Sequence, residues 1–238
     1  GHKETTENLG FSERMKKMFH MKEKFAEIPE KEVLTEILQS DMENIRGTME
    51  SLDKDAFSMA AELIQNAKKI YIVGIRSCEP LADFLGFYLN MLFDEVHVVR
   101  TNSASEIFEQ LMRIRAGDVL IGISFPKYSM RTVKAMELAN SRSAGVISIT
   151  DSIHSPLNLY SSCNLIARSE MASVVDSLTA PLSVINALIV ALCLRNQDSL
   201  KQSIDTLDQL YDDYQVYGRD EMDPFDGEIE IFHQGSKV

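Results

Sequence analysis

Short apolar runs recur through the middle of this chain, and each ends in a glycine or in a loop rich in hydroxyl groups. Two of these runs lie at 119–123 and 146–149. Runs this short and this apolar are typical of parallel strands that are buried on both faces. Between them a helical pattern begins just after Ser129, so the stretch predicts a strand, a loop, a helix and a second strand.

The same alternation extends to both sides of this unit. We expect further strands at 70–74, 96–99 and 164–167, with helical patterns between them, one of which ends near Arg115. Strands that alternate with helices favour an α/β fold. The sequence therefore predicts a five-stranded parallel sheet that lies between helices in a three-layer sandwich.

Helical patterns also lie outside the predicted sheet. One spans 32–52, and Asp53 is placed to act as the N-cap of the next helix. The nearly all-apolar stretch 174–194 predicts a long helix in the core or at a subunit interface. We do not expect it to span a membrane, because polar residues and a proline interrupt it.

Charge and cysteine content narrow the possible functions. The formal net charge is −12, and residues 197–238 hold 3 basic and 11 acidic side chains, whereas 69–196 hold 11 of each. A neutral sheet domain with an acidic tail is a poor nucleic-acid binder. The three cysteines are far apart, so no zinc site, redox pair or other cofactor is expected. No signal peptide or membrane span is recognisable, so we expect a cytoplasmic protein without a membrane partner.

Hydroxyl-rich loops follow four of the predicted strands. Carboxyl ends of parallel strands are where open α/β sheets bind ligands. The loops after the first and third strands contribute Arg76, Ser77, Ser124, Lys127, Tyr128, Ser129 and Thr132. Hydroxyls, basic side chains and free N–H groups at helix starts favour a phosphate group. Taken singly, each loop is equally explained as a helix cap, and Ser77 is expected to cap the helix that follows it.

Four motifs carry a family resemblance. GIRSCEPLADFL, VLIGISFPKYSMRTVKAMELA, GVISITDSIHSPL and VVDSLTAPLSVINALI occur in this order over roughly residues 10 to 195. Together they resemble the sugar-isomerase (SIS) domain of RpiR-type bacterial transcription regulators. The resemblance implies a homodimer whose SIS domain binds a sugar phosphate in the loops at Ser77 and 124–132. It also implies that operator DNA is bound by a separate N-terminal helix-turn-helix domain.

The resemblance divides the chain into four expected parts. Residues 1–30 combine a tag-derived start with a remnant of the helix-turn-helix domain and its linker, and 31–68 form a helical extension. Residues 69–196 form the SIS domain, and 197–238 a C-terminal helix with an acidic tail. The recognition helix is missing from this chain, so no residue present here is assigned to DNA.

An isomerase is the alternative. Enzymes of the wider SIS group commonly carry S-x-S-G-x-T in the phosphate loop, whereas residues 124–129 read SFPKYS. The missing glycine limits close backbone approach to a phosphate, and the form resembles that of the regulators. Isomerisation would need a carboxylate base and an acid. Glu170 is the first candidate for the base, Glu79 the second, and His154 is the candidate acid.

Overall fold

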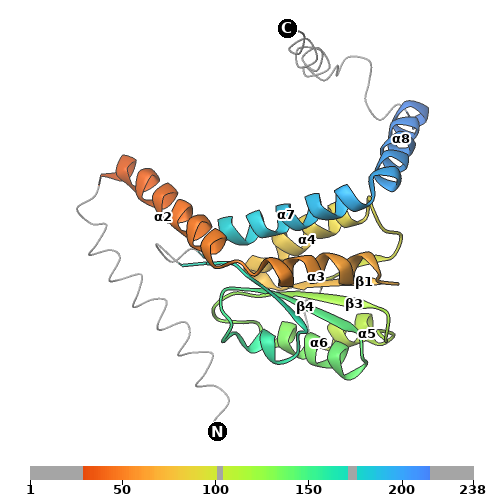
Figure 1. Ribbon diagram of the computed structural model, residues 1–238, viewed down its shortest axis with the longest axis horizontal. Helices are drawn as coiled ribbons and strands as arrows, with labels where there is room; N and C mark the ends of the chain where they lie inside the picture. Colours follow the sequence, from red (N-terminus) through yellow and green to blue (C-terminus); the bar gives the residue numbers. More distant parts are fainter. Residues whose placement is uncertain (1–28, 101–103, 171–175, 215–238) are drawn as a thin grey trace. The chain divides into compact units, whose positions relative to one another are not determined.

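The computed structural model describes residues 29–100, 104–170 and 176–214. The chain divides into two compact units, one ending at Arg195 and one beginning at Asn196. The first unit contains the sheet and the helices packed on it (Figure 1). The expected parts 1–30 and 215–238 lie almost wholly outside the described residues.

Five parallel strands form one sheet. They are β1 (Ile70–Gly74), β2 (Val96–Val99), β3 (Val119–Ile123), β4 (Gly145–Thr150) and β5 (Cys163–Ile166). Their order across the sheet is β2-β1-β3-β4-β5, and every neighbouring pair is parallel. The predicted sheet is thus confirmed, with each strand boundary within one residue. The order reverses direction between β1 and β3, which opens a crevice at the carboxyl ends of these two strands.

Helices cover both faces of the sheet (Figure 1). On one face lie α3 (Lys54–Gln65), α4 (Glu79–Leu89) and α7 (Thr179–Arg195), which contact the sheet or one another. On the other lie α5 (Ala104–Leu111) and α6 (Met130–Ser141). The central strands β1 and β3 are buried along their whole length, as strands with two covered faces must be.

The helix before the sheet is well predicted at its ends. The helix α2 spans Glu30–Ser51, against the expected 32–52. Asp53 caps α3 as expected, because its carboxylate accepts the backbone N–H groups of Asp55 and Ala56 at 2.9 Å each.

Two helix boundaries differ from the prediction. The described part of the last apolar stretch is helical only from Thr179, and 176–178 are non-helical. Polar side chains there bond to other elements instead: Ser177 donates a hydrogen bond to Asp41 at 2.6 Å. The helix α5 ends at Leu111 rather than near Arg115, because the Arg115 N–H donates to the Asp118 carboxylate in a turn.

The described residues also bear on membranes and thiols. No single helix among them is long and apolar enough to cross a membrane; α7 passes that test only when joined to α8 (Gln197–Tyr214) as a bent pair. Cys78 and Cys163 are buried free thiols, and burial raises the pKa of each to about 11. The helix α8, in the second unit, has no buried residue.

Candidate functional site

The loop after β3 is fixed by its own hydroxyl groups. The Ser124 side chain is buried and its Oγ accepts the Ser129 backbone N–H at 2.9 Å. Ser129 is the N-cap of α6, and its Oγ accepts the Thr132 N–H at 3.4 Å. The first turn of a helix supplies no acceptor for its own N–H groups, so those of Met130 and Arg131 lie at the helix start without an intrahelical partner.

Thr132 is the most informative residue in this loop. It is fully buried at the start of α6, and its Oγ1 has no hydrogen-bond partner within the described part of the chain. A buried hydroxyl without a partner costs free energy, so a protein retains one where a ligand or water completes it. A helix start with such a hydroxyl suits an anion.

Both predicted basic residues stand in unusual backbone conformations. Lys127 has a φ of 65° and Arg76 a φ of 59°, values that side-chain-bearing residues rarely adopt. Both side chains are exposed. Strained positions of this kind persist where the surrounding loop fixes them, and here they lie in the two loops that leave β1 and β3.

The loop after β1 lies beside the loop after β3. Gly74 pairs with Ile123 at the ends of the two strands. Gly74 admits the Cys78 carbonyl oxygen 2.5 Å from where a Cβ would stand, so no larger residue fits this turn. Among the influences on the Cys78 thiol is a hydrogen bond with the backbone of Phe125, which joins the two loops.

Ser77 does not cap α4. The N-cap position belongs to Cys78, and no side chain caps the helix there. The Ser77 hydroxyl is exposed and donates to the Asp176 carboxylate at 3.3 Å. The prediction was wrong because a short 3₁₀ turn, Arg76–Cys78, precedes the helix and moves its start by one residue.

Tyr128 bonds to the loop after β4. Its hydroxyl donates to Asp151 Oδ1 at 2.8 Å, which also receives a hydrogen bond from Thr150. Burial, followed by this hydrogen bond, raises the pKa of Tyr128 to about 12. Tyr128 therefore stays a neutral donor and ties two loops together at the carboxyl edge of the sheet.

The loop after β5 is held by α2. The Asn44 side chain bonds to the backbone of Glu170 twice, donating to its carbonyl at 3.0 Å and accepting its N–H at 3.1 Å. The Thr48 hydroxyl accepts the Arg168 N–H at 2.8 Å. With the bond from Ser177 to Asp41, these contacts fasten α2 to the segment that leads into α7.

The candidate acid and bases are not gathered around a reacting centre. The Glu170 carboxylate is 80% exposed and lies 4.0 Å from Arg168. His154 is exposed in the loop after β4, and Glu79 is exposed at the start of α4. No group of three or more histidine, cysteine or acidic side chains suited to a metal occurs among the described residues.

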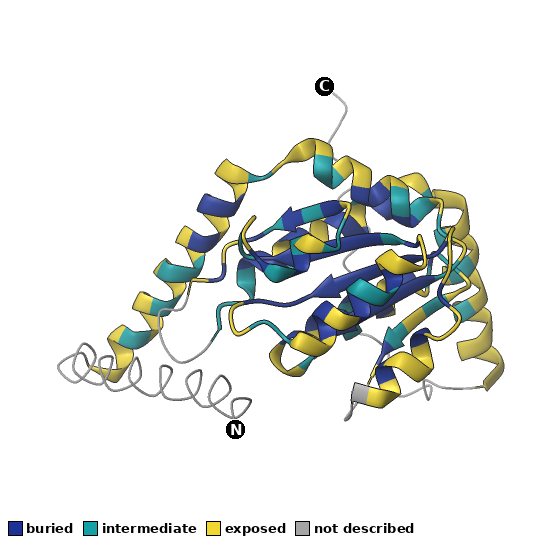
Figure 2. Cartoon of the chain, turned by 90° about the horizontal axis from the view of Figure 1, so that it is seen from below, coloured by how far each residue is buried: buried dark blue, intermediate teal, exposed yellow. Residues whose placement is uncertain are grey.

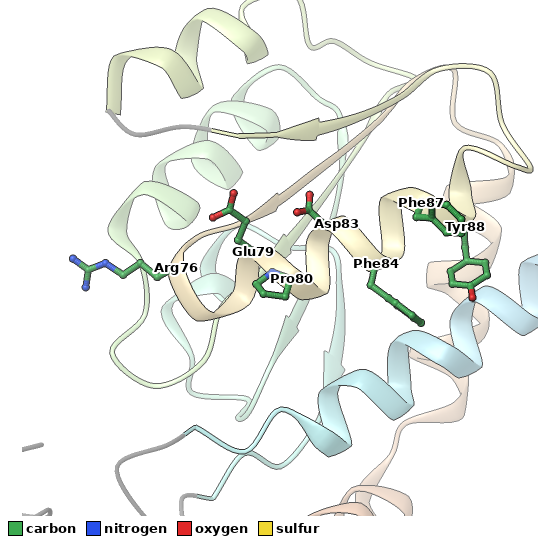
Figure 3. A pocket seen from close by; sticks show the side chains of 7 residues that line it. All are labelled: Arg76, Glu79, Pro80, Asp83, Phe84, Phe87 and Tyr88. Carbon is green, nitrogen blue, oxygen red and sulfur yellow. The ribbon is translucent and has the colours of Figure 1, made fainter. Parts of the chain in front are cut away.

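A separate hollow lies on the outer side of α4 (Figure 3). It is open, with a volume of about 700 Å³, and is lined by Arg76, Glu79, Pro80, Asp83, Phe84, Phe87 and Tyr88. Of the predicted ligand residues, only Arg76 borders it. The hydroxyls of the loop after β3 do not, so the hollow and the predicted phosphate loop are different places.

Sequence reasoning missed the residues that connect the site to α2. Asp176 was read only as an interruption of an apolar helix. Asp41, Asn44 and Thr48 were not considered, although polar residues at spacings of three and four on one face of an otherwise apolar helix are a usable signal.

The model of the SIS domain family matches residues 63–191. The chain belongs to the SIS domain family. Its fold and site therefore carry the expected family arrangement, with a five-stranded parallel sheet and hydroxyl-rich loops at its carboxyl edge.

Curated relatives of this SIS domain are transcription regulators. An HTH-type regulator of Caldanaerobacter subterraneus is 26% identical over 186 residues, which are 75% of this chain and 64% of the relative. The HTH-type transcriptional regulator HexR of Escherichia coli is 27% identical over 193 residues, 76% of this chain and 64% of HexR. This SIS chain thus spans less than two thirds of either relative.

Solved structures share the fold. The sugar isomerase domain of an RpiR transcription factor from Sphaerobacter thermophilus superposes with a TM-score of 0.70 and 25% identity, covering 74% of this chain and 97% of that one. Vibrio vulnificus NanR, complexed with ManNAc-6P, gives 0.65 and 17%, covering 79% and 72%. Phosphoheptose isomerase GmhA from Neisseria gonorrhoeae gives 0.59 and 17%, covering 68% and 98%.

Proposed function

We propose that this chain is the phosphosugar-sensing effector and dimerisation part of an RpiR-type transcriptional regulator. The phosphate of the ligand lies at the start of α6, among Ser124, Ser129 and Thr132, with Lys127 supplying charge. Binding changes the DNA affinity of a helix-turn-helix domain that belongs to the regulator and not to the residues present here. The relatives that are HTH-type regulators and the NanR structure with ManNAc-6P support this assignment.

The single observation that carries the proposal is the unpartnered hydroxyl of Thr132. It is fully buried at the first turn of a helix whose N–H groups face the switch point of the sheet. A phosphate oxygen is an acceptor for both the hydroxyl and the helix N–H groups. The ligand would thus satisfy a donor that folding leaves unsatisfied.

The contacts around Ser77 and α2 give ligand binding a route toward the N-terminus. Ser77 touches Asp176, and the neighbouring Ser177 bonds to Asp41 of α2. A ligand that draws the loop after β1 toward itself changes the first contact in this chain of bonds. Differential binding energy between two arrangements of α2 is then sufficient for regulation.

An isomerase is the second candidate. The shared fold with phosphoheptose isomerase and the placement of Glu170 after β5 favour it. The exposed carboxylate and the absence of a neighbouring acid among the described groups weigh against it. If the chain interconverts a phosphorylated aldose and ketose, and Glu170→Gln abolishes that turnover, the sensor-only assignment fails.

Thr132→Val tests the phosphate site directly. Valine matches threonine in shape but lacks the hydroxyl, and removing an unpartnered buried hydroxyl spares a cost of roughly 1–3 kcal/mol. We expect the free variant to melt at or above the temperature of the wild type. The rise in melting temperature that a sugar phosphate gives the wild type should shrink by more than half.

The panel for this experiment contains sugar phosphates, the matching free sugars and inorganic phosphate. Ser141→Ala, at the far end of α6, is the matched control and should keep the full rise. A Thr132→Val protein that responds to the ligand as the wild type does would move the phosphate away from α6. No response of the wild type to any phosphorylated sugar would leave only a dimerisation module.

A further inference from the structure

The helix α2 is built with its polar residues inward. Its only buried residues, Asn44, Gly47 and Thr48, all lie in its second half, and two of them bond to the loop after β5. Gly47 lies against Arg168, whose side chain fills the space where a Cβ would stand. A helix that meets its own domain through polar groups needs no apolar residue for that contact.

Its outward side is nevertheless apolar. Five large side chains remain exposed: Leu34 by 66%, Leu38 by 53%, Met42 by 58%, Ile45 by 38% and Met49 by 71%. At 100° per residue they fall within an arc of about 80°, so they form one stripe roughly 22 Å long. We call these five residues the outer stripe (Figure 2).

Charges are arranged around the outer stripe so that it stays neutral. Four carboxylates of the helix, those of Glu32, Glu36, Glu43 and Glu50, lie about 120–160° around the helix from the middle of the stripe. They face away from anything that packs on it. Two copies of this acidic helix can therefore approach along the stripe without placing carboxylates against carboxylates.

The outer stripe is also close to self-complementary. Its members follow one another at steps of four, four, three and four residues, so the pattern reads almost the same from either end. A two-fold interface places the same patch on both partners and requires this property. In an antiparallel pair, Leu34 meets Met49 and Leu38 meets Ile45, while Met42 lies beside its own copy.

We propose that the outer stripe of α2 pairs antiparallel with the outer stripe of a second copy of this chain. This rests on the dimerisation that is part of the proposed function, and it names the surface. The first half of α2 has no buried residue of its own, whereas the second half is anchored to the domain. Antiparallel pairing lays the uncovered half of one copy on the anchored half of the other. The interface thus joins the two helices that also hold the loops after β5.

Site-directed cross-linking tests the pairing. Facing helices lie 8–10 Å apart, which is too far for most disulfides, so a short bis-maleimide is the suitable reagent. The full chain with Cys193→Ser is the background, because Cys193 is the cysteine that is not fully buried. We expect the double variant Leu34→Cys with Met49→Cys to give a covalent dimer at least fivefold more abundant than either single variant gives.

The control is Glu43→Cys on the opposite side of α2, which should give no more dimer than the background. Strong cross-linking of both single variants would show a parallel pair and overturn the proposal. Absence of the dimer from the double variant would also overturn it, and would leave the stripe to another segment of this chain or to another protein.

A charge exchange at the two-fold axis gives an independent measurement. Met42→Glu and Met42→Lys should each weaken dimerisation at least tenfold in sedimentation, and an equimolar mixture of the two should restore it. Failure of the mixture to associate would contradict the position of the axis. The melting rise with sugar phosphate is recorded on the same variants. Loss of cross-linking with that rise intact sinks only the interface, whereas loss of the rise in the wild type sinks the sensor.

Discussion

The loops after β3 and after β1 were expected to form one phosphate cradle, yet they are built by opposite means. The β3 loop holds itself: Ser124 bonds to Ser129, and Ser129 caps the helix that follows. The β1 loop has no such internal bond from its serine, since Ser77 turns outward to Asp176. One loop is preformed for a ligand, while the other reports to a neighbouring element. A site with one fixed and one responsive wall suits a sensor, because binding must move something to be detected.

The largest effect is expected from Ser124→Ala. The variant removes a buried acceptor and leaves the Ser129 N–H without its bond, at a cost of roughly 1–3 kcal/mol. For a domain of this size each kcal/mol lowers the melting temperature by about 2–4 °C. Calorimetry of the variant against Ser141→Ala checks this. A loss below about 0.5 kcal/mol would mean that the β3 loop does not depend on its own hydroxyls.

A smaller and pH-dependent effect is expected from Tyr128→Phe. The lost hydrogen bond to Asp151 should cost about 1–2 kcal/mol at neutral pH. Because the folded protein raises the pKa of Tyr128 from 10.0 to about 12, this stabilisation is complete below pH 10 and disappears as the pH rises through 12. Urea unfolding of both proteins from pH 8 to pH 12 should show the difference shrinking over that window.

Cys78, Cys163 and Tyr71 also have raised pKa values and are the same in both proteins, so their contributions cancel. A difference in unfolding free energy that stays constant up to pH 12 would contradict the role given to the tyrosine hydroxyl.

The smallest effect on stability is expected from Ser77→Ala. The hydroxyl is exposed, and its bond to Asp176 is long, so its loss should change the free energy of unfolding by less than about 0.5 kcal/mol. Chemical denaturation measures this directly. If Ser77→Ala destabilises the protein as much as Ser124→Ala does, the two walls are equally fixed and the contrast between them is lost.

Much of this arrangement follows from local sequence signals. The apolar runs predicted all five strands, because a strand buried on both faces admits few polar residues. Ser129 and Asp53 were recognisable as helix caps, since their side chains bond within three residues along the chain.

What the sequence did not predict depends on contacts between distant segments. The pairing of Asn44 with Glu170 spans 126 residues, and Ser77 and Asp176 are 99 apart. Neither leaves a local pattern. The expected helix cap at Ser77 and the early start of α7 were wrong for the same reason: Ser77 and Ser177 have partners far along the chain that no local rule reveals.

The bonds between Asn44 and residue 170 go to the backbone and leave the side chain unused. Any amino acid with a free backbone N–H could occupy position 170 without loosening the loop. The scaffold therefore separates how this segment is held from what chemistry it presents. A carboxylate there can be gained, lost or replaced at little cost to folding, which gives one architecture a short route between turning a sugar phosphate over and merely detecting it.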